Sequence, residues 1–317
     1  QAPADPGELG QHGHLDVLDG YIERLLAMIN PAVLRPLKLV VNAGNGCAGP
    51  FFDRLAEGLP LEVIRLHHEP DGHFPNGVPN PLLPENRAET AAAVVDSHAD
   101  FGIAWDGDFD RCFFFDDQGR FIEGYYLVGL FASQLLSRHP GGKIVLDPRL
   151  TWNTLDQVAE AKGQALINKS GHAFIKERMR AEDAIYGGEM SAHHYFRDFS
   201  YCDSGMIPWL LLAEILSTTG KSLAELVDER ITAYPCSGEI NFSVPDTQRV
   251  MDRVLERFAE ADGELDRTDG ISLAFPEWRF NLRASNTEPV IRLNVESRAD
   301  PALMQAKVEE LSALIKA

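Results

Sequence analysis

The sequence Phe101-Gly-Ile-Ala-Trp-Asp-Gly-Asp-Phe-Asp-Arg111 joins a short apolar segment to three alternating aspartates and an arginine. The apolar segment predicts a strand, which places the carboxylates of Asp106, Asp108 and Asp110 in one turn at its carboxyl end. Clustered carboxylates repel one another, so a bound cation is the simplest way to hold them together. Oxygen ligands favour Mg²⁺, Mn²⁺ or Ca²⁺ over Zn²⁺. We therefore predict a site for a hard divalent cation in this turn.

An EF-hand loop also begins with alternating aspartates, but two positions exclude it. The sixth position of such a loop requires glycine and is Arg111 here, and the twelfth requires glutamate and is Asp117. A cation site beside an arginine that attracts an anion is the usual combination in phosphoryl transfer. On the motif alone, a solvated acidic turn remains the alternative.

The overall composition describes a globular protein with more than one domain. A chain of 317 residues is too long for one ordinary core, and 44% hydrophobic with 24% charged residues is typical of a folded protein. The net charge of −19 argues against general binding to nucleic acid or to an anionic membrane, since both rely on basic surfaces. The four cysteines lie far apart, and no membrane span or signal peptide is visible, so we expect reduced thiols and a cytoplasmic location.

Apolar periodicity predicts strands that alternate with helices over the first two thirds of the chain. The expected helices are residues 15–30, 50–57 and 85–97, and the expected strands are 37–41, 61–66, 101–105, 144–146, 165–169 and 184–187. A turn at 235–238 begins a region of different pattern, with strands at 271–274, 279–282 and 290–295 and helices at 247–260 and 301–315. We predict two consecutive α/β domains with mixed sheets, residues 1–119 and 120–234, followed by a smaller α+β C-terminal domain, residues 235–317.

The segment Gly187-Gly-Glu-Met-Ser-Ala-His-His194 lies where a strand is expected to end. Glu189 and Ser191 are two residues apart, so in an extended loop both side chains can point the same way and bind sugar hydroxyls. Glu189 with His193 could instead bind zinc, although no third ligand at a usual spacing supports that. A hydrogen-bonded turn with surface histidines is the structural alternative.

The segment Arg283-Ala-Ser-Asn-Thr-Glu-Pro289 lies between two expected strands. The side chains of Ser285, Asn286 and Thr287, the backbone N–H groups and the guanidinium of Arg283 favour phosphate binding. A simple hairpin turn is the alternative, because serine and asparagine favour turns.

Two further basic positions follow expected strands. Lys169-Ser-Gly-His172 precedes a helix, where an anion would be stabilised and His172 could move a proton near neutral pH. Arg149 lies at the carboxyl end of another strand, where ligands of α/β sheets collect. The turn at residues 42–46 matches neither the P-loop nor the dinucleotide-binding pattern, and we assign it to packing. The motifs of serine hydrolases, zinc proteases, kinases and NAD dehydrogenases are absent from the sequence.

Taken in order, these segments resemble the α-D-phosphohexomutase family, in particular its phosphomannomutase/phosphoglucomutase branch, over essentially the whole chain. The resemblance implies that Asp106, Asp108 and Asp110 hold Mg²⁺ and that Arg111 contacts the phosphate of a phosphoserine. It assigns Glu189 and Ser191 to the sugar's 3- and 4-hydroxyls, with His193 nearby. It assigns Arg149 and His172 to the reacting end, with His172 a candidate proton mover. It assigns the substrate's non-reacting phosphate to Arg283, Ser285, Asn286 and Thr287.

The implied reaction interconverts mannose 6-phosphate and mannose 1-phosphate through a hexose 1,6-bisphosphate. Phe109 and Ala192 depart from the small residue and the glycine common at these positions. The family's nucleophilic serine lies in a first-domain loop, Thr-Ala-Ser-His-Asn-Pro, which does not occur here. We therefore expect that the chain is a piece of a longer protein, that its first domain is missing, and that it has no mutase activity alone.

Three other functions remain open at this point. The first is phosphoglucomutase or a bifunctional enzyme. Mannose and glucose differ in stereochemistry at C2 of the sugar, and the residues named above hardly distinguish the two. The second belongs to another class, a non-catalytic protein that binds sugar phosphates. A metal-dependent phosphatase is the least favoured, because the aspartate loop does not match its Asp-x-Asp-x-[Thr/Val] pattern.

Overall fold

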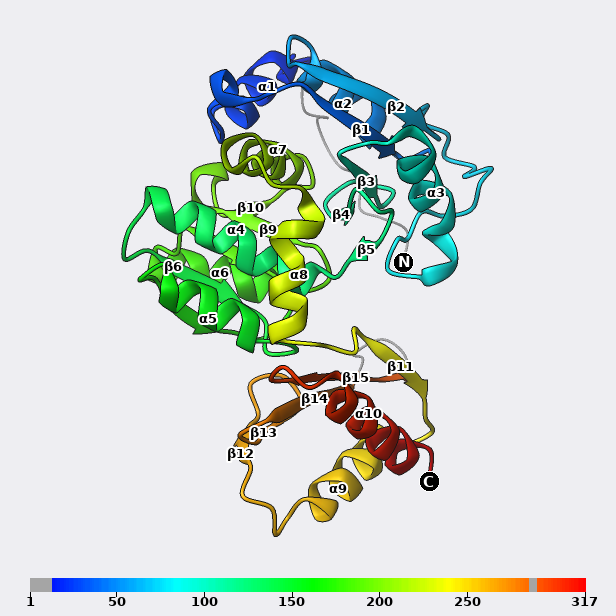
Figure 1. Ribbon diagram of the computed structural model, residues 1–317, viewed down its shortest axis with the longest axis vertical. Coiled ribbons are helices and arrows are strands. Elements are labelled where there is room, and N and C mark those ends of the chain that lie inside the picture. Colours follow the sequence, from blue (N-terminus) through cyan, green and yellow to red (C-terminus); the bar gives the residue numbers. More distant parts are fainter. Residues whose placement is uncertain (1–12, 285–289) are drawn as a thin grey trace, which may run out of the picture.

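The computed structural model of the chain describes residues 13–284 and 290–317. It contains three five-stranded sheets, each with its own helices, which follow one another along the chain (Figure 1). The first two sheets are mixed and the third is antiparallel, so the predicted fold class of two α/β units followed by an α+β unit is confirmed. Within these residues, none of the helices is both long enough and apolar enough to cross a membrane.

The first unit has the strand order β2-β1-β3-β4-β5. Its strands are β1 (Leu37–Asn42), β2 (Leu61–Leu66), β3 (Phe101–Trp105), β4 (Cys112–Phe115) and β5 (Phe121–Ile122), and its helices are α1 (Leu18–Leu26), α2 (Ala48–Ala56) and α3 (Ala88–Ser97). Strands β2, β1 and β3 are parallel, whereas β4 and β5 are antiparallel. Val40 packs in the small core that contains α3, while Leu39 and Val41 pack in the main core with α2. Because β1 is buried on both faces, the successive residues Leu39, Val40 and Val41 are all apolar and buried instead of alternating with polar residues.

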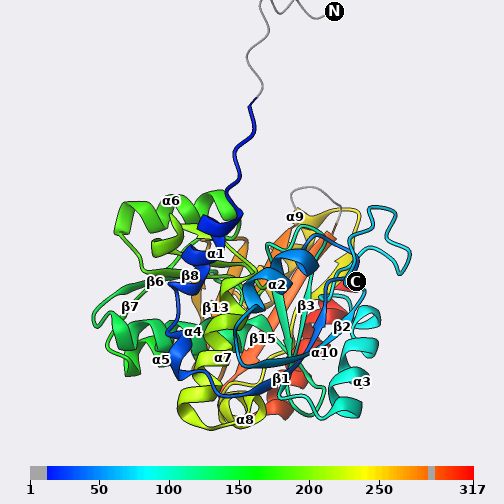
Figure 2. The ribbon, with the colours of Figure 1, turned by 90° about the horizontal axis from the view of Figure 1, so that it is seen from above.

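The second unit repeats this topology, with the order β7-β6-β8-β9-β10. Its strands are β6 (Lys143–Leu146), β7 (Gln164–Ile167), β8 (Tyr186–Gly188), β9 (His194–Phe196) and β10 (Cys202–Asp203), and its helices are α4 (Gly124–Arg138), α5 (Trp152–Glu160), α6 (His172–Glu182), α7 (Ile207–Thr219) and α8 (Leu223–Ala233). Again three parallel strands are followed by an antiparallel hairpin. Figure 2 shows the sheet between α6 on one side and α4 and α5 on the other. A capping box of Ser222 and Glu225 starts α8.

The third unit is an antiparallel sheet covered by two helices. Its strands are β11 (Ile240–Ser243), β12 (Glu264–Asp266), β13 (Ile271–Ala274), β14 (Trp278–Ala284) and β15 (Val290–Ser297), and its helices are α9 (Thr247–Arg257) and α10 (Pro301–Lys316). The helices cover the face of the sheet that is turned away from the other two units (Figure 1). Asp300 caps the N-terminus of α10, where Pro301 occupies the first turn.

The first two units share one hydrophobic core, whereas the third has a core of its own. Helix α7 lies between the two α/β units, and its buried residues 207–216 are apolar except for Glu214. The ring of Trp209 lies 5.0 Å from that of Phe52, and the indole N–H of Trp105 donates to the carbonyl oxygen of Gly205 at 2.9 Å. The first two units are therefore fixed to each other by apolar contacts.

The sequence-based boundaries agree with the structure in most elements and fail in identifiable places. Strands 61–66, 101–105 and 271–274 were predicted to the residue. The helix expected at 15–30 covers only Leu18–Leu26, because residues 27–29 form turns before Pro31. The prediction omitted β4, β5, β9, β10 and β12, which are two to four residues long and carry little periodicity.

Buried His194 makes the chain sensitive to mild acid. Its Nδ1 lies 2.6 Å from the hydroxyl of Tyr186, and burial lowers the pKa of the imidazole to about 3. The unfolded chain takes up a proton here below about pH 6.5, whereas the folded chain does not until about pH 3. Stability therefore falls as the pH drops below 6.5, by about 1 kcal/mol between pH 6.5 and 5.5 from this group.

Urea unfolding at the two pH values, compared with a His194→Gln variant, measures this contribution. Glutamine keeps a hydrogen-bonding partner for Tyr186 but does not titrate. The pH-induced loss of stability should be smaller in the variant by about 1 kcal/mol. An equal loss in both proteins would show that His194 is not the group responsible.

Candidate active site

The two α/β units meet at topologically equivalent loops. The β3–β4 loop carries the three aspartates and Arg111, and the β8–β9 loop carries Glu189, Ser191 and His193. The loops are joined by an antiparallel bridge between Arg111 and His193 and by a 3.3 Å hydrogen bond from the N–H of Cys112 to the carbonyl oxygen of Ala192. Both loops follow the carboxyl end of a parallel strand, where α/β sheets bind ligands. Two segments that are about eighty residues apart thus form one site.

The aspartate loop is organised around Arg111. This residue donates from Nε to Oδ2 of Asp106 at 2.6 Å and from its backbone N–H to Oδ1 of the same carboxylate at 3.2 Å. The turn at residues 42–46 packs beneath the loop, as predicted: a Cβ on Gly46 would lie 2.6 Å from the carbonyl oxygen of Gly107. Glycine is therefore required at position 46 by the close approach of the two loops.

The three aspartates suit a hard cation. Carboxylate oxygens of Asp106, Asp108 and Asp110 lie within 4.8 Å of one another. Burial raises the pKa of Asp106 above its usual value, with Arg111 acting in the opposite direction, while contact with His193 lowers the pKa of Asp110. A buried carboxylate whose charged form is disfavoured gains from a nearby divalent cation, and the donors are all oxygen.

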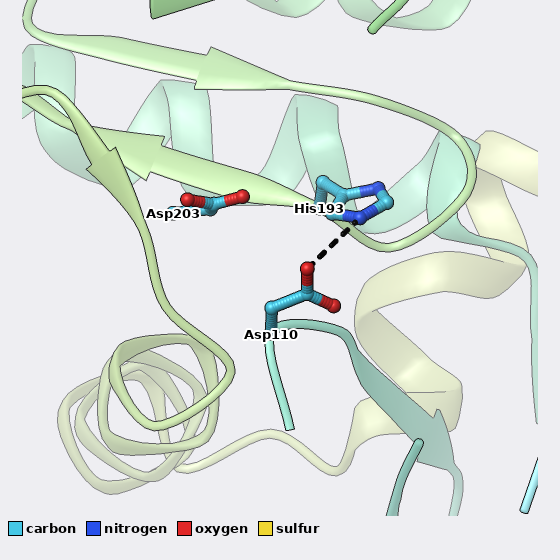
Figure 3. A group of neighbouring side chains, drawn as sticks. All are labelled: Asp110, His193 and Asp203. Carbon is cyan, nitrogen blue, oxygen red and sulfur yellow. Dashed lines mark ion pairs between the residues drawn. The ribbon is translucent and has the colours of Figure 1, made fainter. Parts of the chain in front are cut away.

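His193 belongs to the β8–β9 loop and reaches across to Asp110 of the aspartate loop (Figure 3). Its Nε2 is 3.5 Å from Oδ2 of Asp110, and its Nδ1 is 3.6 Å from Oε2 of Glu189. Asp203 lies close enough to Asp110 and His193 for all three to approach one ion. The ammonium group of Lys176 is 2.7 Å from Asp203, however, and already balances its charge. Within the described residues, no cluster of three possible metal ligands contains Glu189, so the zinc alternative gains no support.

Phe109 and Ala192, the two departures from the family pattern, share a backbone conformation. Their φ angles are +52° and +71°, in the left-handed region that glycine adopts without strain. The ring of Phe109 packs at 5.3 Å from that of Phe51, and its carbonyl oxygen accepts the N–H of Gly205. These contacts hold the aspartate loop in shape despite the unfavourable residue.

Glu189 and Ser191 are fixed by neighbouring side chains. Oε1 of Glu189 accepts the N–H of Gly171 at 2.9 Å, and Oε2 accepts the hydroxyl of Tyr195 at 2.7 Å. The hydroxyl of Ser191 accepts from Nη2 of Arg149 at 3.2 Å and lies 3.3 Å from Nδ1 of His193. The carboxylate of Glu189 is buried, which fixes its orientation before any ligand binds.

Arg149 is buried among carboxylates. It donates three hydrogen bonds of 2.9–3.0 Å to Asp147 and one of 3.3 Å to Glu239, and it lies 3.8 Å from Glu189. Burial by itself would lower the pKa of the guanidinium, but Asp147 and Glu239 outweigh burial and raise it. Glu239 precedes β11, so the third unit also contributes to this site.

The remaining predicted residues lie around a second junction, between the second and third units. His172 is the first residue of α6 and is exposed. The carboxylate of Asp269 accepts from the N–H of Ser170 and from Nη1 of Arg283, each at 3.2 Å. Asp269 therefore joins the loop of His172 to the predicted phosphate arginine. Ser285, Asn286 and Thr287 lie outside the described residues.

Replacing Asp269 by asparagine is expected to lower the free energy of unfolding by about 1–3 kcal/mol. The buried carboxylate has a charged donor, Arg283, and a backbone donor, and a neutral amide satisfies both less well. Urea unfolding measures the effect, with exposed Asp262→Asn as the control. Equal stability of the two variants would contradict this role for Asp269.

Sequence reasoning missed Asp147, Glu239 and Asp269 as site residues. Asp147 had a local signal, because it precedes Arg149 by two residues at the end of a strand. Glu239 had none, because Arg149 lies 90 residues away, and Asp269 had none, because its partners Arg283 and Ser170 lie 14 and 99 residues away.

Comparison with known proteins agrees with this architecture. Residues 19–119 match the family model for phosphoglucomutase/phosphomannomutase alpha/beta/alpha domain II, residues 123–234 that for domain III, and residues 239–313 that for the C-terminal domain. The chain is 60% identical over 315 residues to a protein of Xanthomonas campestris named phosphohexose mutases, and 59% identical over 320 residues to a phosphomannomutase of Escherichia coli. Each match covers 99% of the chain and 70% of the relative.

Solved structures show the same arrangement. A phosphoglucomutase/phosphomannomutase family protein of Burkholderia thailandensis is 35% identical with a TM-score of 0.83, over 95% of this chain and 64% of that one. A putative phosphomannomutase of Thermus thermophilus, 24% identical with a TM-score of 0.81, shares the fold over 97% of this chain and 68% of that one.

The fold and site thus define a class of α/β proteins in which an aspartate loop and a Gly-Glu-Met-Ser loop meet between two sheets of equal topology. The chain belongs to the phosphoglucomutase/phosphomannomutase family of phosphohexomutases. It spans about 70% of the length of the curated relatives it matches and 64% of the Burkholderia chain.

Proposed function

We propose that this chain is the metal-binding and sugar-phosphate-binding part of a phosphomannomutase. The observation that carries the proposal is the junction of the aspartate loop with the Glu189–His193 loop and Arg149. At this junction the three clustered aspartates, the side chains of Glu189 and Ser191 and a buried arginine lie next to one another. Relatives that are 53–59% identical carry the name phosphomannomutase, and this supports our choice of mannose phosphates over glucose phosphates as the substrates of this chain.

Each part of the site has a proposed role in the reaction. Asp106, Asp108 and Asp110 would hold Mg²⁺, which when bound offsets negative charge on the transferring phosphoryl group. Arg111, already fixed by Asp106, would bind an oxygen of that group. Mg²⁺ and a hexose bisphosphate are features of solved relatives too distant to carry this assignment by themselves.

The sugar is proposed to bind between the second and third units. Glu189 and Ser191 would bind two neighbouring hydroxyls, and Arg283 with Ser285, Asn286 and Thr287 would bind the phosphate that does not react. Arg149 and His172 would lie at the reacting end, where exposed His172 can move a proton. Holding one phosphate and the hydroxyls fixes the sugar for transfer at its other end.

The reaction also needs a phosphoserine, which in the family lies in a Thr-Ala-Ser-His-Asn-Pro loop that does not occur in the sequence given. In the proposed reaction, the phosphoserine first transfers its phosphoryl group to the sugar phosphate, which gives a hexose 1,6-bisphosphate. The serine then accepts the phosphoryl group that the sugar phosphate carried at the start. We infer that the 317-residue chain alone catalyses no turnover. Measurable mutase activity of the purified chain would contradict this inference.

Calorimetric titration of mannose 1-phosphate in the presence of Mg²⁺ tests the binding function. We expect the chain to bind the ligand and an Arg283→Ala variant to bind it at least about tenfold more weakly, because a charge-assisted hydrogen bond is lost. Arg257→Ala, which removes an exposed arginine of the same unit, is the control. The same titration with glucose 1-phosphate separates the two sugar specificities, and equal binding by both arginine variants would contradict the proposal.

A further inference from the structure

A buried ion pair of the third unit points into the second unit. Arg279 on β14 and Glu296 on β15 lie directly opposite each other, with Nη1 and Oε1 2.7 Å apart. Both side chains are almost completely buried. Their strand neighbours Phe280 and Val295 face the core beneath α9 and α10, so the ion pair points out of the opposite face of the sheet. Burying two charges is costly unless their remaining hydrogen-bonding groups are satisfied.

Those remaining groups are satisfied by the second unit, mainly by the loop of residues 147–152 and also by Tyr125 of α4. Arg279 donates from Nη2 to the carbonyl oxygen of Pro148 at 2.8 Å and from Nη1 to that of Arg149 at 3.1 Å. Glu296 accepts the backbone N–H of Thr151 at 2.8 Å and the hydroxyl of Tyr125. Arg279 thus binds two carbonyl groups of the loop, and Glu296 binds the N–H group of Thr151 just before α5.

These hydrogen bonds lie on both sides of Arg149, the buried arginine of the candidate active site. Its own carbonyl oxygen and that of the preceding residue are held by Arg279, and Thr151 two residues later is held by Glu296. The backbone therefore cannot rotate at position 149 without breaking these bonds. The third unit, which carries Arg279 and Glu296, also supplies Glu239, which accepts a hydrogen bond from the Arg149 side chain at 3.3 Å.

We propose that Arg279 and Glu296 are positioning residues for Arg149, so that docking of the third unit sets the direction of this guanidinium towards Ser191. The consequence for ligand binding depends on the proposed function, whereas the consequence for the loop does not. A pair that only held the two units together would act on the whole interface and not on this loop in particular.

Hydrogen exchange tests the effect on the loop without any ligand. In Glu296→Gln, the amide can accept from fewer donors than the carboxylate, so we expect the Thr151 N–H to exchange at least about tenfold faster. The Nε–H signal of Arg149 should shift at the same time. Glu214→Gln is the matched control, because Glu214 is equally buried and ion-paired to Arg138 but contacts neither residue. No change in Glu296→Gln, or the same change in both variants, would overturn the proposal.

A double-mutant cycle tests the route to the ligand. We expect Glu296→Gln to weaken mannose 1-phosphate binding about tenfold in the native chain and to have almost no further effect in an Arg149→Lys chain. Equal losses in both backgrounds would mean that the pair does not act through Arg149, and the proposal would fall. If the native chain binds no sugar phosphate, the proposed function fails, and the exchange measurement alone decides on the positioning role.

Discussion

Replacing Arg149 by methionine is expected to lower the free energy of unfolding by about 3–5 kcal/mol. Asp147 and Glu189 are almost completely buried, and the guanidinium of Arg149 lies within 3.8 Å of both carboxylates. Glu239 is its third anionic neighbour. Arg149 and Met190 lower the pKa of Asp147 against the effect of burial, so removing the arginine leaves a carboxylate that has lost its main stabilising partner.

Urea unfolding compares this variant with Arg65→Met, which breaks a half-exposed ion pair to Asp53. The control should change the stability by no more than about 1 kcal/mol. The sign of the pH dependence gives a second check. In Arg149→Met the buried carboxylate of Asp147 loses the partner that lowers its pKa and gains from protonation, so the deficit in stability should shrink as the pH falls from 7 to 5. A loss below about 1 kcal/mol would contradict the central position of Arg149.

Replacing Asp110 by asparagine is expected to reduce Mn²⁺ affinity by more than about 100-fold. Mn²⁺ is a spectroscopic substitute for Mg²⁺ with the same preference for oxygen ligands. Removing even an outer-shell partner of a metal costs about 10–100-fold in affinity, and Asp110 is a proposed direct ligand. Asp110 is a better test than Asp106, because Asp106 is buried and also holds Arg111, so its loss would disturb the loop.

Titration of free Mn²⁺ by electron paramagnetic resonance measures this affinity directly. The control is Asp96→Asn, which removes an exposed carboxylate from α3 and leaves the net charge equal to that of the Asp110 variant. Binding that is retained in Asp110→Asn, or is lost equally in both variants, would show that the aspartate loop does not hold the metal. The contact of Asp110 with His193 would then serve only to join the two loops.

The order of strands and helices could be predicted because it depends on local patterns. The alternation of apolar strands with amphipathic helices up to about residue 234, and its change after the turn at 235–238, gave the fold class that the structure shows. The short strands β4, β5, β9 and β10 were missed, although β4 and β9 directly follow Arg111 and His193, the residues whose bridge joins the two active-site loops. These strands are too short to carry a period, and their pairing is decided by the sheets to which they add.

The candidate site divides in the same way. The sequence identified Asp106, Asp108, Asp110 and the Glu189–His193 segment, because chemistry-bearing residues are close together in the chain and follow apolar strands. Their placement at one junction is now seen, while their roles remain predictions. The strained φ angles at Phe109 and Ala192 gave no sequence signal beyond the absence of glycine.

The sequence by itself determined the local elements, the fold class and the chemistry of each loop, because these depend on residues within a few positions of one another. Only the tertiary structure decided which residues from distant parts of the chain contact these loops. Glu239 lies 90 residues from Arg149, and Glu296 lies 145 residues from Thr151, yet both hold the same loop. Such contacts follow from the way whole sheets pack, and packing sums many weak apolar contacts over the entire chain. No local pattern contains that sum, so the contacts of Glu239 and Glu296 with this loop could be seen only in the folded molecule.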